Sequence, residues 1–272
     1  VHLGRGKRFT IKNGVFQTFD DAIALNAYAW PVGNPELGWI ENGVVEKCWD
    51  LPAHEAVGFF CRLLAGAWLD WAPGMKLQQG DTVVSEGRLY RVQAKPDGTV
   101  YTSDTQPKHT EGQCILDGIP WGMVQTDVTY TAGVRNVAFR DIFLETNRPA
   151  FSYKFDNGRF SRSYYPGAPI PMQEELTFDN VRVLHDGDSP LVAINTPVDV
   201  VKMTNCSFKN NPIDITSDPE MHDNGKTHIS LIGCTFRHDG AMTLISNHVP
   251  GKMIELKTTA SIPVSDAFTA TV

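Results

Sequence analysis

The chain of 272 residues contains no long apolar run, no run of like charges and no metal-binding cysteine motif. A membrane-spanning helix needs about 20 consecutive apolar residues, so we expect no membrane span. Nucleic-acid-binding proteins usually carry a basic stripe, whereas the net charge here is −7. We therefore expect no nucleic-acid partner, no metal and no cofactor.

Six short stretches repeat one pattern, in which apolar and polar residues alternate, stop at Asn, Asp or Gly, and resume. They cover residues 9–16, 38–45, 137–144, 176–183, 200–208 and 229–236, and they align on Asn13, Asn42, Asp141, Asn180, Asn205 and Gly233. The spacings between these residues are 29, 99, 39, 25 and 28, and periods of about 20 to 50 residues are typical of solenoids. The pattern predicts stacked coils with an insertion in the longest gap.

A strand that alternates in this way buries only one face, so neighbouring coils are needed to complete a core. Inward positions such as Phe9, Ile11 and Val15 hold the β-branched and aromatic residues that strands favour. Asn, Asp and Gly tolerate the left-handed backbone that turns the chain between faces of a coil. A helical repeat is the alternative, but only residues 55–68 approach the helical period. We predict an all-β fold.

These repeats resemble the right-handed parallel β-helix proteins of the pectate lyase-like superfamily, over roughly residues 1–66 and 129–261. Residues 14–26, which contain Asp20 and Asp21, look like the strand with paired aspartates in polygalacturonase-type glycoside hydrolases. The resemblance implies an all-β, right-handed parallel β-helix (solenoid) with a small inserted β module. Lyases, phage tailspikes and epimerases share the coil pattern, so it indicates the fold better than the reaction.

The chain enters its first repeat almost at Val1. An uncapped solenoid end exposes backbone edges and core. We therefore expect earlier coils, and any export signal, to precede this sequence. We also expect the protein to be secreted, periplasmic, at the cell surface or part of a virion.

Five cysteines are present, at Cys48, Cys61, Cys114, Cys206 and Cys234. Cys206 and Cys234 hold the same position in consecutive repeats, as does Cys48 in an earlier one. An odd number of cysteines gives no framework of disulfides. We interpret these positions as buried thiols in a core ladder, with disulfides as the alternative.

The longest gap predicts three parts: residues 1–66 as the first part of the β-helix, 67–128 as an inserted small β module, and 129–272 as the continued β-helix with a C-terminal tail. Residues 71–92 predict two short strands joined at 85–87, and residues 117–121 predict a closing hairpin.

The insertion resembles the small β modules of the chitin-binding type 3 kind, which pair an early Trp with a Gly-Asp-x-Val strand and a Gly-x-x-Tyr strand. The resemblance implies that Trp71, Tyr90 and Trp121 stack on sugar rings. The alternative is that these aromatic side chains are the core of a small module, which must bury them to be stable.

Asp20 and Asp21 are the sharpest catalytic candidates. Two adjacent acids on a strand point to opposite faces, so both cannot be buried at low cost unless the strand bends. In inverting glycosidases one carboxylic acid protonates the leaving oxygen and another carboxylate activates water. The resemblance implies this role here, and a solvated turn in which either aspartate caps backbone N–H groups is the alternative.

Further candidates come from aligning residues 22–26 with 58–62 and 150–154. This alignment stacks Arg62 and Lys154 on Asn26, sets Arg148 at the level of Asp20, and places two further acid or base candidates, His54 and Glu55, just before that level. The resemblance implies that such a histidine and cations hold a uronate carboxylate.

The loop at residues 155–171 carries Arg159, Arg162, Tyr164 and Tyr165. Binding residues often lie on loops of a rigid scaffold, and Arg offers bidentate hydrogen bonds while Tyr offers a stacking face. The alternative is that the tyrosines cover the edges of the coils. Residues 214–225 suggest a calcium loop but lack the regular spacing of an EF-hand, and we predict no metal there.

The prediction is a glycoside hydrolase that cleaves an acidic or neutral polysaccharide by paired-carboxylate acid/base catalysis. A non-catalytic glycan-binding or phage tailspike-type receptor-binding protein is the alternative, and a polysaccharide lyase is a further one. The protein would be a monomer or, as in tailspikes of this fold, a homotrimer.

Overall fold

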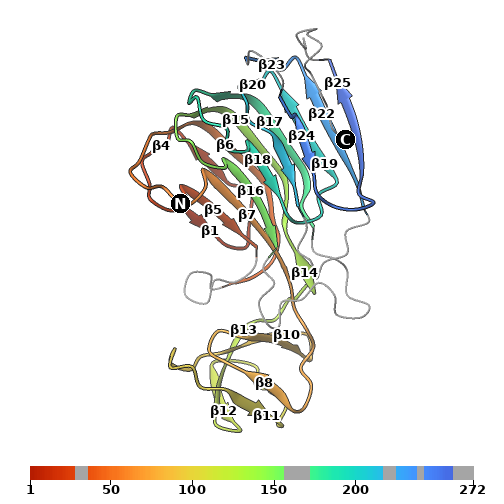
Figure 1. Cartoon of the computed structure of the whole chain (residues 1–272). Coiled ribbons are helices and arrows are strands. Elements are labelled where there is room, and N and C mark those ends of the chain that lie inside the picture. Colours follow the sequence, from red (N-terminus) through yellow and green to blue (C-terminus); the bar gives the residue numbers. More distant parts are fainter. Residues whose placement is uncertain (28–35, 156–171, 217–224, 238–241, 260–272) are drawn as a thin grey trace.

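The computed structural model of the chain describes residues 1–27, 36–155, 172–216, 225–237 and 242–259. Every regular element in these residues is a strand, and none is a helix. Two long parallel sheets stack against each other as in a β-helix, with small antiparallel sheets beside them (Figure 1). The predicted all-β solenoid is confirmed. The described residues contain no helix long and apolar enough to cross a membrane.

The first sheet, sheet A, has eight strands in the described residues. In spatial order they are β1 (His2–Leu3), β5 (Ile23–Asn26), β7 (Cys61–Ala67), β16 (Phe151–Phe155), β18 (Val192–Ile194), β21 (Ile213–Ile215) and β24 (Ile245–Asn247), with β14 (Thr131–Ala132) pairing antiparallel to β7.

The second sheet, sheet B, has eleven strands in the described residues. Its main path is β2 (Gly6–Lys7), β6 (Ile40–Asp50), β15 (Val134–Leu144), β17 (Glu174–Val183), β19 (Val200–Thr204), β22 (Lys226–Ile232) and β25 (Met253–Thr258). Short strands β3 (Thr10–Lys12), β4 (Val15–Phe16), β20 (Ser207–Phe208) and β23 (Thr235–Phe236) extend individual coils.

The chain passes from one sheet to the other and back, so each coil adds a strand to both sheets. Strand order within each sheet therefore follows chain order, which Figure 1 shows as the colour gradient from red to blue. Parallel pairing needs such a crossover connection between successive strands.

Each long strand of sheet B bends at left-handed residues, and two rows of such corners run along the solenoid. One row holds Asn13, Lys47, Asp141, Asn180, Asn205 and Gly233, and the other holds Arg8, Asn42, Asn136 and Glu175. The alignment of Asn42 with Asn13 is therefore wrong, because the residue level with Asn13 in the second coil is Lys47. Five of the six predicted corner residues do share one row.

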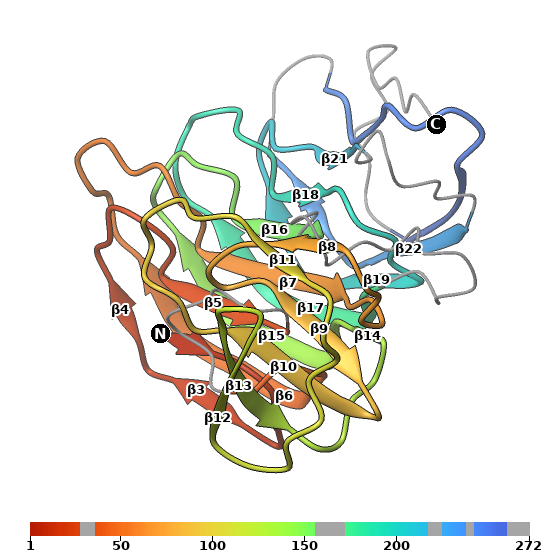
Figure 2. The same cartoon turned by 90° about the horizontal axis from the view of Figure 1, so that it is seen from below.

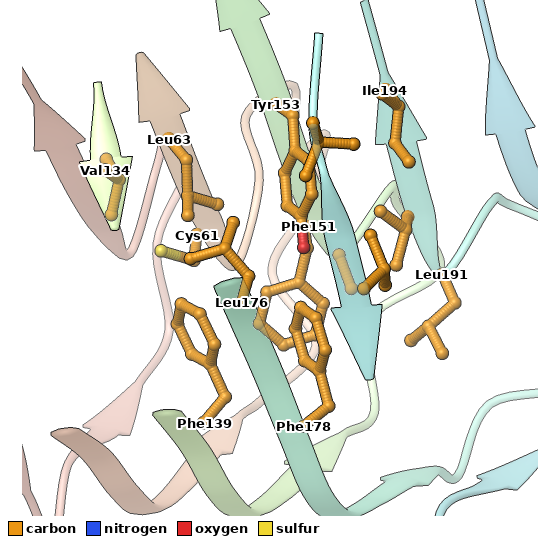
Figure 3. Packing of buried hydrophobic residues seen from close by; sticks show 14 of the residues in the cluster. Cys61, Leu63, Val134, Phe139, Phe151, Tyr153, Leu176, Phe178, Leu191 and Ile194 are labelled. Carbon is orange, nitrogen blue, oxygen red and sulfur yellow. The ribbon is translucent and has the colours of Figure 1, made fainter. Parts of the chain in front are cut away.

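The core between the sheets is built from aromatic rings that stack from coil to coil. Figure 3 shows Phe139 and Phe178 facing each other below Phe151. The rings of Phe139 and Phe178 are 5.2 Å apart and 11° from parallel, and Phe151 contacts both edge-on at 4.9 and 4.8 Å. Pairs of this kind add about 0.5–1.5 kcal/mol beyond the burial of their area.

The predicted thiol ladder is confirmed. Cys48, Cys206 and Cys234 are buried, and their thiols are free. They occupy one inward row, because Cys48 pairs with Ile142 and the same row continues through Val181. The row therefore holds apolar side chains of different size, and the thiols fill it as small hydrophobic groups.

Between β7 and β14 the chain leaves the two long sheets. Its strands are β8 (Met75–Leu77), β9 (Thr82–Ser85), β10 (Arg88–Val92), β11 (Tyr101–Ser103), β12 (Gln113–Leu116) and β13 (Ile119–Gln125). They pair with each other as two antiparallel sheets, β12–β13–β10–β9 and β11–β8, and lie in front of the solenoid in Figure 2. The predicted hairpins at 85–87 and 117–121 are both present.

Candidate functional site

Asp20 and Asp21 lie in the turn that leads into β5, at the edge of sheet A. Asp21 is nearly enclosed, with 8% of its side chain exposed. Its Oδ1 accepts a hydrogen bond from the Phe59 amide at 3.0 Å, and its Oδ2 lies 3.1 Å from Nε of Arg62. Asp20 is exposed, and its Oδ1 accepts the backbone N–H of Asp21 at 2.9 Å. The two carboxyl groups therefore have different surroundings. A general acid and a general base in one site need such a difference, because one must hold a proton while the other is ionised.

The next coil approaches the aspartate turn too closely for any side chain at Gly58. A Cβ built there would lie 2.4 Å from the Asp21 nitrogen and 2.5 Å from the Asp20 carbonyl carbon. The backbone N–H of Val57 also donates to the Phe19 carbonyl at 2.9 Å. Glycine thus permits the contact that fixes both aspartates against the second coil.

The electrostatic balance at Asp21 raises the pKa of its carboxyl. Burial raises the pKa of the Asp21 carboxyl, and the charge of Arg62 and the hydrogen bond from Phe59 oppose that rise without cancelling it. The neighbouring Asp20 charge raises the pKa further, and Lys154 lowers it. An upward shift of a carboxyl pKa is the direction that a general acid needs.

Two cations flank the aspartates. Arg62 pairs with Asp21, and the Nζ of Lys154 lies 4.7 Å above the centre of the Phe59 ring. Since Phe59 donates its amide to Asp21, the acid and both cations share one small region. The site therefore combines two carboxylates, two cations and one partly exposed ring.

The predicted register of Arg62 is wrong by two residues. Arg62 pairs with Ala24 and Ser152, and Leu64 is the residue that lies between Asn26 and Lys154. The alignment of residues 22–26 with 150–154 is correct. A slip of two residues leaves side chains on the same face, which is why Arg62 still reaches Asp21.

Arg148 does reach the level of Asp20, but it lies under the site rather than in it. Its Nη2 lies 2.6 Å from Oδ1 of Asp50, and its Nε donates to Oδ2 of Asp50 at 3.2 Å. Nη1 donates to the Asp20 carbonyl at 3.2 Å, and Nη2 also donates to the Thr18 hydroxyl at 3.3 Å. Only 3% of the Arg148 side chain is exposed, so this cation supports the aspartate turn and does not contact a ligand.

His54 and Glu55 lie on the surface, with 89% and 77% of their side chains exposed. His54 Nδ1 is 3.9 Å from Glu55 Oε2. No hydrogen bond or ion pair joins either residue to Asp20 or Asp21 in the part of the chain that the structure describes. The structure brings Asp20, Asp21, Arg62 and Lys154 together and leaves this pair outside.

The aromatic residues of the insertion have a structural explanation. Tyr90 and Trp121 are fully buried in the core of the small sheets, and the Tyr90 hydroxyl donates to the His109 carbonyl at 2.6 Å. Trp71 packs against the same core, and its Nε1 donates to Ser103 Oγ at 2.8 Å. Tyr90 and Trp121 therefore form the core of the small module, and their rings are not accessible to a sugar.

Two predicted features fall wholly or partly outside the described residues. Arg159, Arg162, Tyr164 and Tyr165 lie in residues 156–171, and most of the suggested calcium loop lies in residues 217–224. Asp214, at the start of that loop, accepts from His248 Nε2 at 3.1 Å. In the described ranges no three His, Cys, Asp or Glu side chains converge on a point where a metal ion could bind.

Sequence reasoning missed three residues that build the site. Asp50 neutralises Arg148, Phe59 presents its amide and ring, and Gly58 permits the close contact. Gly58 carried a signal, since an isolated glycine beside a strand often marks a close backbone approach. Asp50 carried none that distinguishes it from other surface acids in the sequence.

No protein family, no curated protein and no solved structure matches this chain. The coil arrangement therefore rests on the strand pairing alone.

Proposed function

We propose that this protein hydrolyses a polysaccharide at the Asp20–Asp21 turn. Asp21 would act as the general acid that protonates the leaving oxygen, and the exposed Asp20 would be the carboxylate that activates water. Arg62 and Lys154 would bind anionic groups of the glycan beside the cleaved bond. The observation that supports this assignment most is the raised pKa of the Asp21 carboxyl next to an exposed second carboxylate.

Arg62 has a double role in this proposal. Its Nε is 3.1 Å from Asp21 Oδ2 but lacks the alignment of a hydrogen bond. The contact is therefore mainly a charge interaction, which stabilises the carboxylate left after Asp21 gives up its proton. A quarter of the Arg62 side chain is exposed, so the same cation can also meet a substrate carboxylate.

The test is release of reducing ends from plant, algal and bacterial polysaccharides by the wild type, Asp20→Asn and Asp21→Asn. We expect the activity of each variant to fall by a factor of about 100 or more, since a positioned acid or base raises the reaction rate by about 10²–10⁴-fold. Asp188→Asn, an exposed aspartate far along the sequence, is the matched control and should keep full activity. Unchanged turnover in both site variants would contradict the assignment.

A non-catalytic glycan-binding protein is the second candidate. The surroundings of Asp21 favour it, because Oδ1 accepts the Phe59 amide, Oδ2 lies against Arg62, and only 8% of the side chain is exposed to a substrate. Glycan binding without release of reducing ends from any polysaccharide would support this candidate over hydrolysis.

A further inference from the structure

The outer face of sheet B carries two open cavities that adjoin each other. One, of about 510 Å³, is lined by Asp141, Arg182 and Thr235 among others. The second, of about 260 Å³, is lined by Arg140, Lys202 and Thr204 among others. Asp179 and Asn205 line both cavities, so together they form one continuous groove, here called the outer groove. It crosses β15, β17 and β19.

Three cations line the outer groove without an ion pair in the described residues. Arg140 and Lys202 are exposed. The Nε–H of Arg182 donates a hydrogen bond to Asn180 Oδ1 at 2.6 Å. Neither terminal guanidinium nitrogen of Arg182 has a partner among the described residues. Three cations against the two carboxylates of Asp141 and Asp179 give the groove a local excess of positive charge, whereas the whole chain has a net charge of −7. A ligand with negative groups would satisfy it.

The hydrogen-bonding groups of the outer groove are held in place by the corner row. Asn180 and Asn205 both have left-handed backbone, with φ of 56° and 54°. Asn180 Nδ2 donates to Asp141 Oδ1 at 2.6 Å, and Asn205 Nδ2 donates to Asp179 Oδ1 at 3.3 Å. Among the described residues no donor reaches the second oxygen of either carboxylate, which can therefore accept from another donor such as a sugar hydroxyl. Groups fixed before binding cost less entropy to engage.

Two aromatic side chains, Phe143 and Trp49, lie in the same cross-strand row as Arg182. Phe143 is the register partner of Arg182 in β15, and its ring stacks on Trp49 with centroids 4.5 Å apart and planes 13° from parallel. Trp49 is 36% exposed. Sugar rings present C–H groups as well as hydroxyls, and an exposed aromatic surface beside polar groups suits both.

We propose that the outer groove binds an oligosaccharide that carries carboxylate or sulfate groups. Arg140, Lys202 and Arg182 would pair with the anionic groups, and the carboxylates of Asp141 and Asp179 would accept from hydroxyls. A polyphosphate chain offers no hydroxyl donors to these two aspartates, which therefore favour a saccharide. The proposal does not depend on hydrolysis at the Asp20–Asp21 turn, since it concerns the other sheet.

The test is calorimetric titration of the full chain with three hexasaccharides: hexagalacturonate, a heparin-derived hexasaccharide and cellohexaose. Asp20→Asn serves as the starting protein, so that no probe is consumed. We expect one anionic probe to bind at least tenfold more tightly than cellohexaose, and the better of the two identifies the anionic group. Arg182→Gln and Lys202→Gln should each weaken that binding about tenfold, as expected for one charged hydrogen bond.

Lys95→Gln, which removes an exposed cation from the insertion, is the charge-matched control and should bind as the starting protein does. Thermal unfolding of Lys95→Gln and Lys202→Gln should be unchanged, because both side chains are exposed. Arg182→Gln also loses the hydrogen bond to Asn180, and its binding is measured below its own melting temperature. The proposal is overturned if neither anionic probe binds, if Arg140→Gln/Lys202→Gln/Arg182→Gln binds as before, or if a single-stranded oligonucleotide of equal charge binds more tightly than both.

Discussion

Arg148 and Asp50 form a buried ion pair that joins two coils of the solenoid. Nη2 of Arg148 lies 2.6 Å from Oδ1 of Asp50, and the two side chains are 3% and 1% exposed. The same guanidinium donates to the Asp20 carbonyl and Thr18 hydroxyl in the first coil. The pair thus supports the aspartate turn from beneath.

Arg148→Met should cost about 3–5 kcal/mol of unfolding free energy, because it leaves the Asp50 carboxylate buried without its partner. Urea unfolding measures the loss. Arg140→Met, at an exposed arginine of similar size, should change stability by less than about 0.5 kcal/mol. Equal stability of the two variants would show that Asp50 is not held by Arg148.

Gly58→Ala should destabilise the protein and displace Asp21. The new Cβ would lie 2.4 Å from the Asp21 nitrogen, so one of the two coils must move. Gly6→Ala is the control, since its Cβ would meet no atom closer than 3.6 Å. Thermal unfolding should separate the two, with only Gly58→Ala lowering the melting temperature. Equal melting temperatures would contradict the close contact.

Tyr153→Phe should stabilise the protein by about 1–3 kcal/mol. The Tyr153 hydroxyl is buried without a hydrogen-bond partner in the described residues, in the core shown in Figure 3. Removal of the hydroxyl eliminates the cost of burying it. Phe151→Leu, a neighbouring core change, should instead be destabilising. A fall in the urea midpoint of Tyr153→Phe would indicate a partner for the hydroxyl.

Glu41 should make stability depend on pH. Hydrogen bonds and charge from Lys7, and then from Arg135, lower the pKa of the Glu41 carboxyl. A lowered folded-state pKa contributes stability above the ordinary value of 4.5, and this contribution is lost as the pH falls through the folded-state pKa. Glu41→Gln should therefore lower the melting temperature at pH 7 more than at pH 3. An equal effect at both values would contradict the linkage.

The sequence predicts the coils well because their signal is local. Alternation with an interruption at Asn180, Asn205 and Gly233 marks strand, corner and strand in each coil, and the structure places all three in one row. The second coil is the exception. Its residue at that corner is a left-handed Lys47, and its asparagine, Asn42, lies at the other corner, so the residue types indicate the wrong corner.

The site is less predictable because it depends on contacts between coils. A strand has a period of two, so the sequence alone does not distinguish the true register of Arg62 from one shifted by two residues. Burial of Arg148 depends on Asp50, 98 residues earlier in the chain. The carboxylate pair was visible because both acids are adjacent in sequence, whereas their unequal burial appears only in the fold.

The most direct test of polysaccharide hydrolysis is the mass of the products formed by the full chain. A hydrolase adds one water molecule for each bond cleaved, so the fragments should take up one ¹⁸O at each new reducing end when the reaction runs in labelled water. Asp20→Asn/Asp21→Asn should form no labelled fragment. Unsaturated fragments without added water would show elimination instead, and intact polysaccharide with bound protein would show that the Asp20–Asp21 turn is not catalytic.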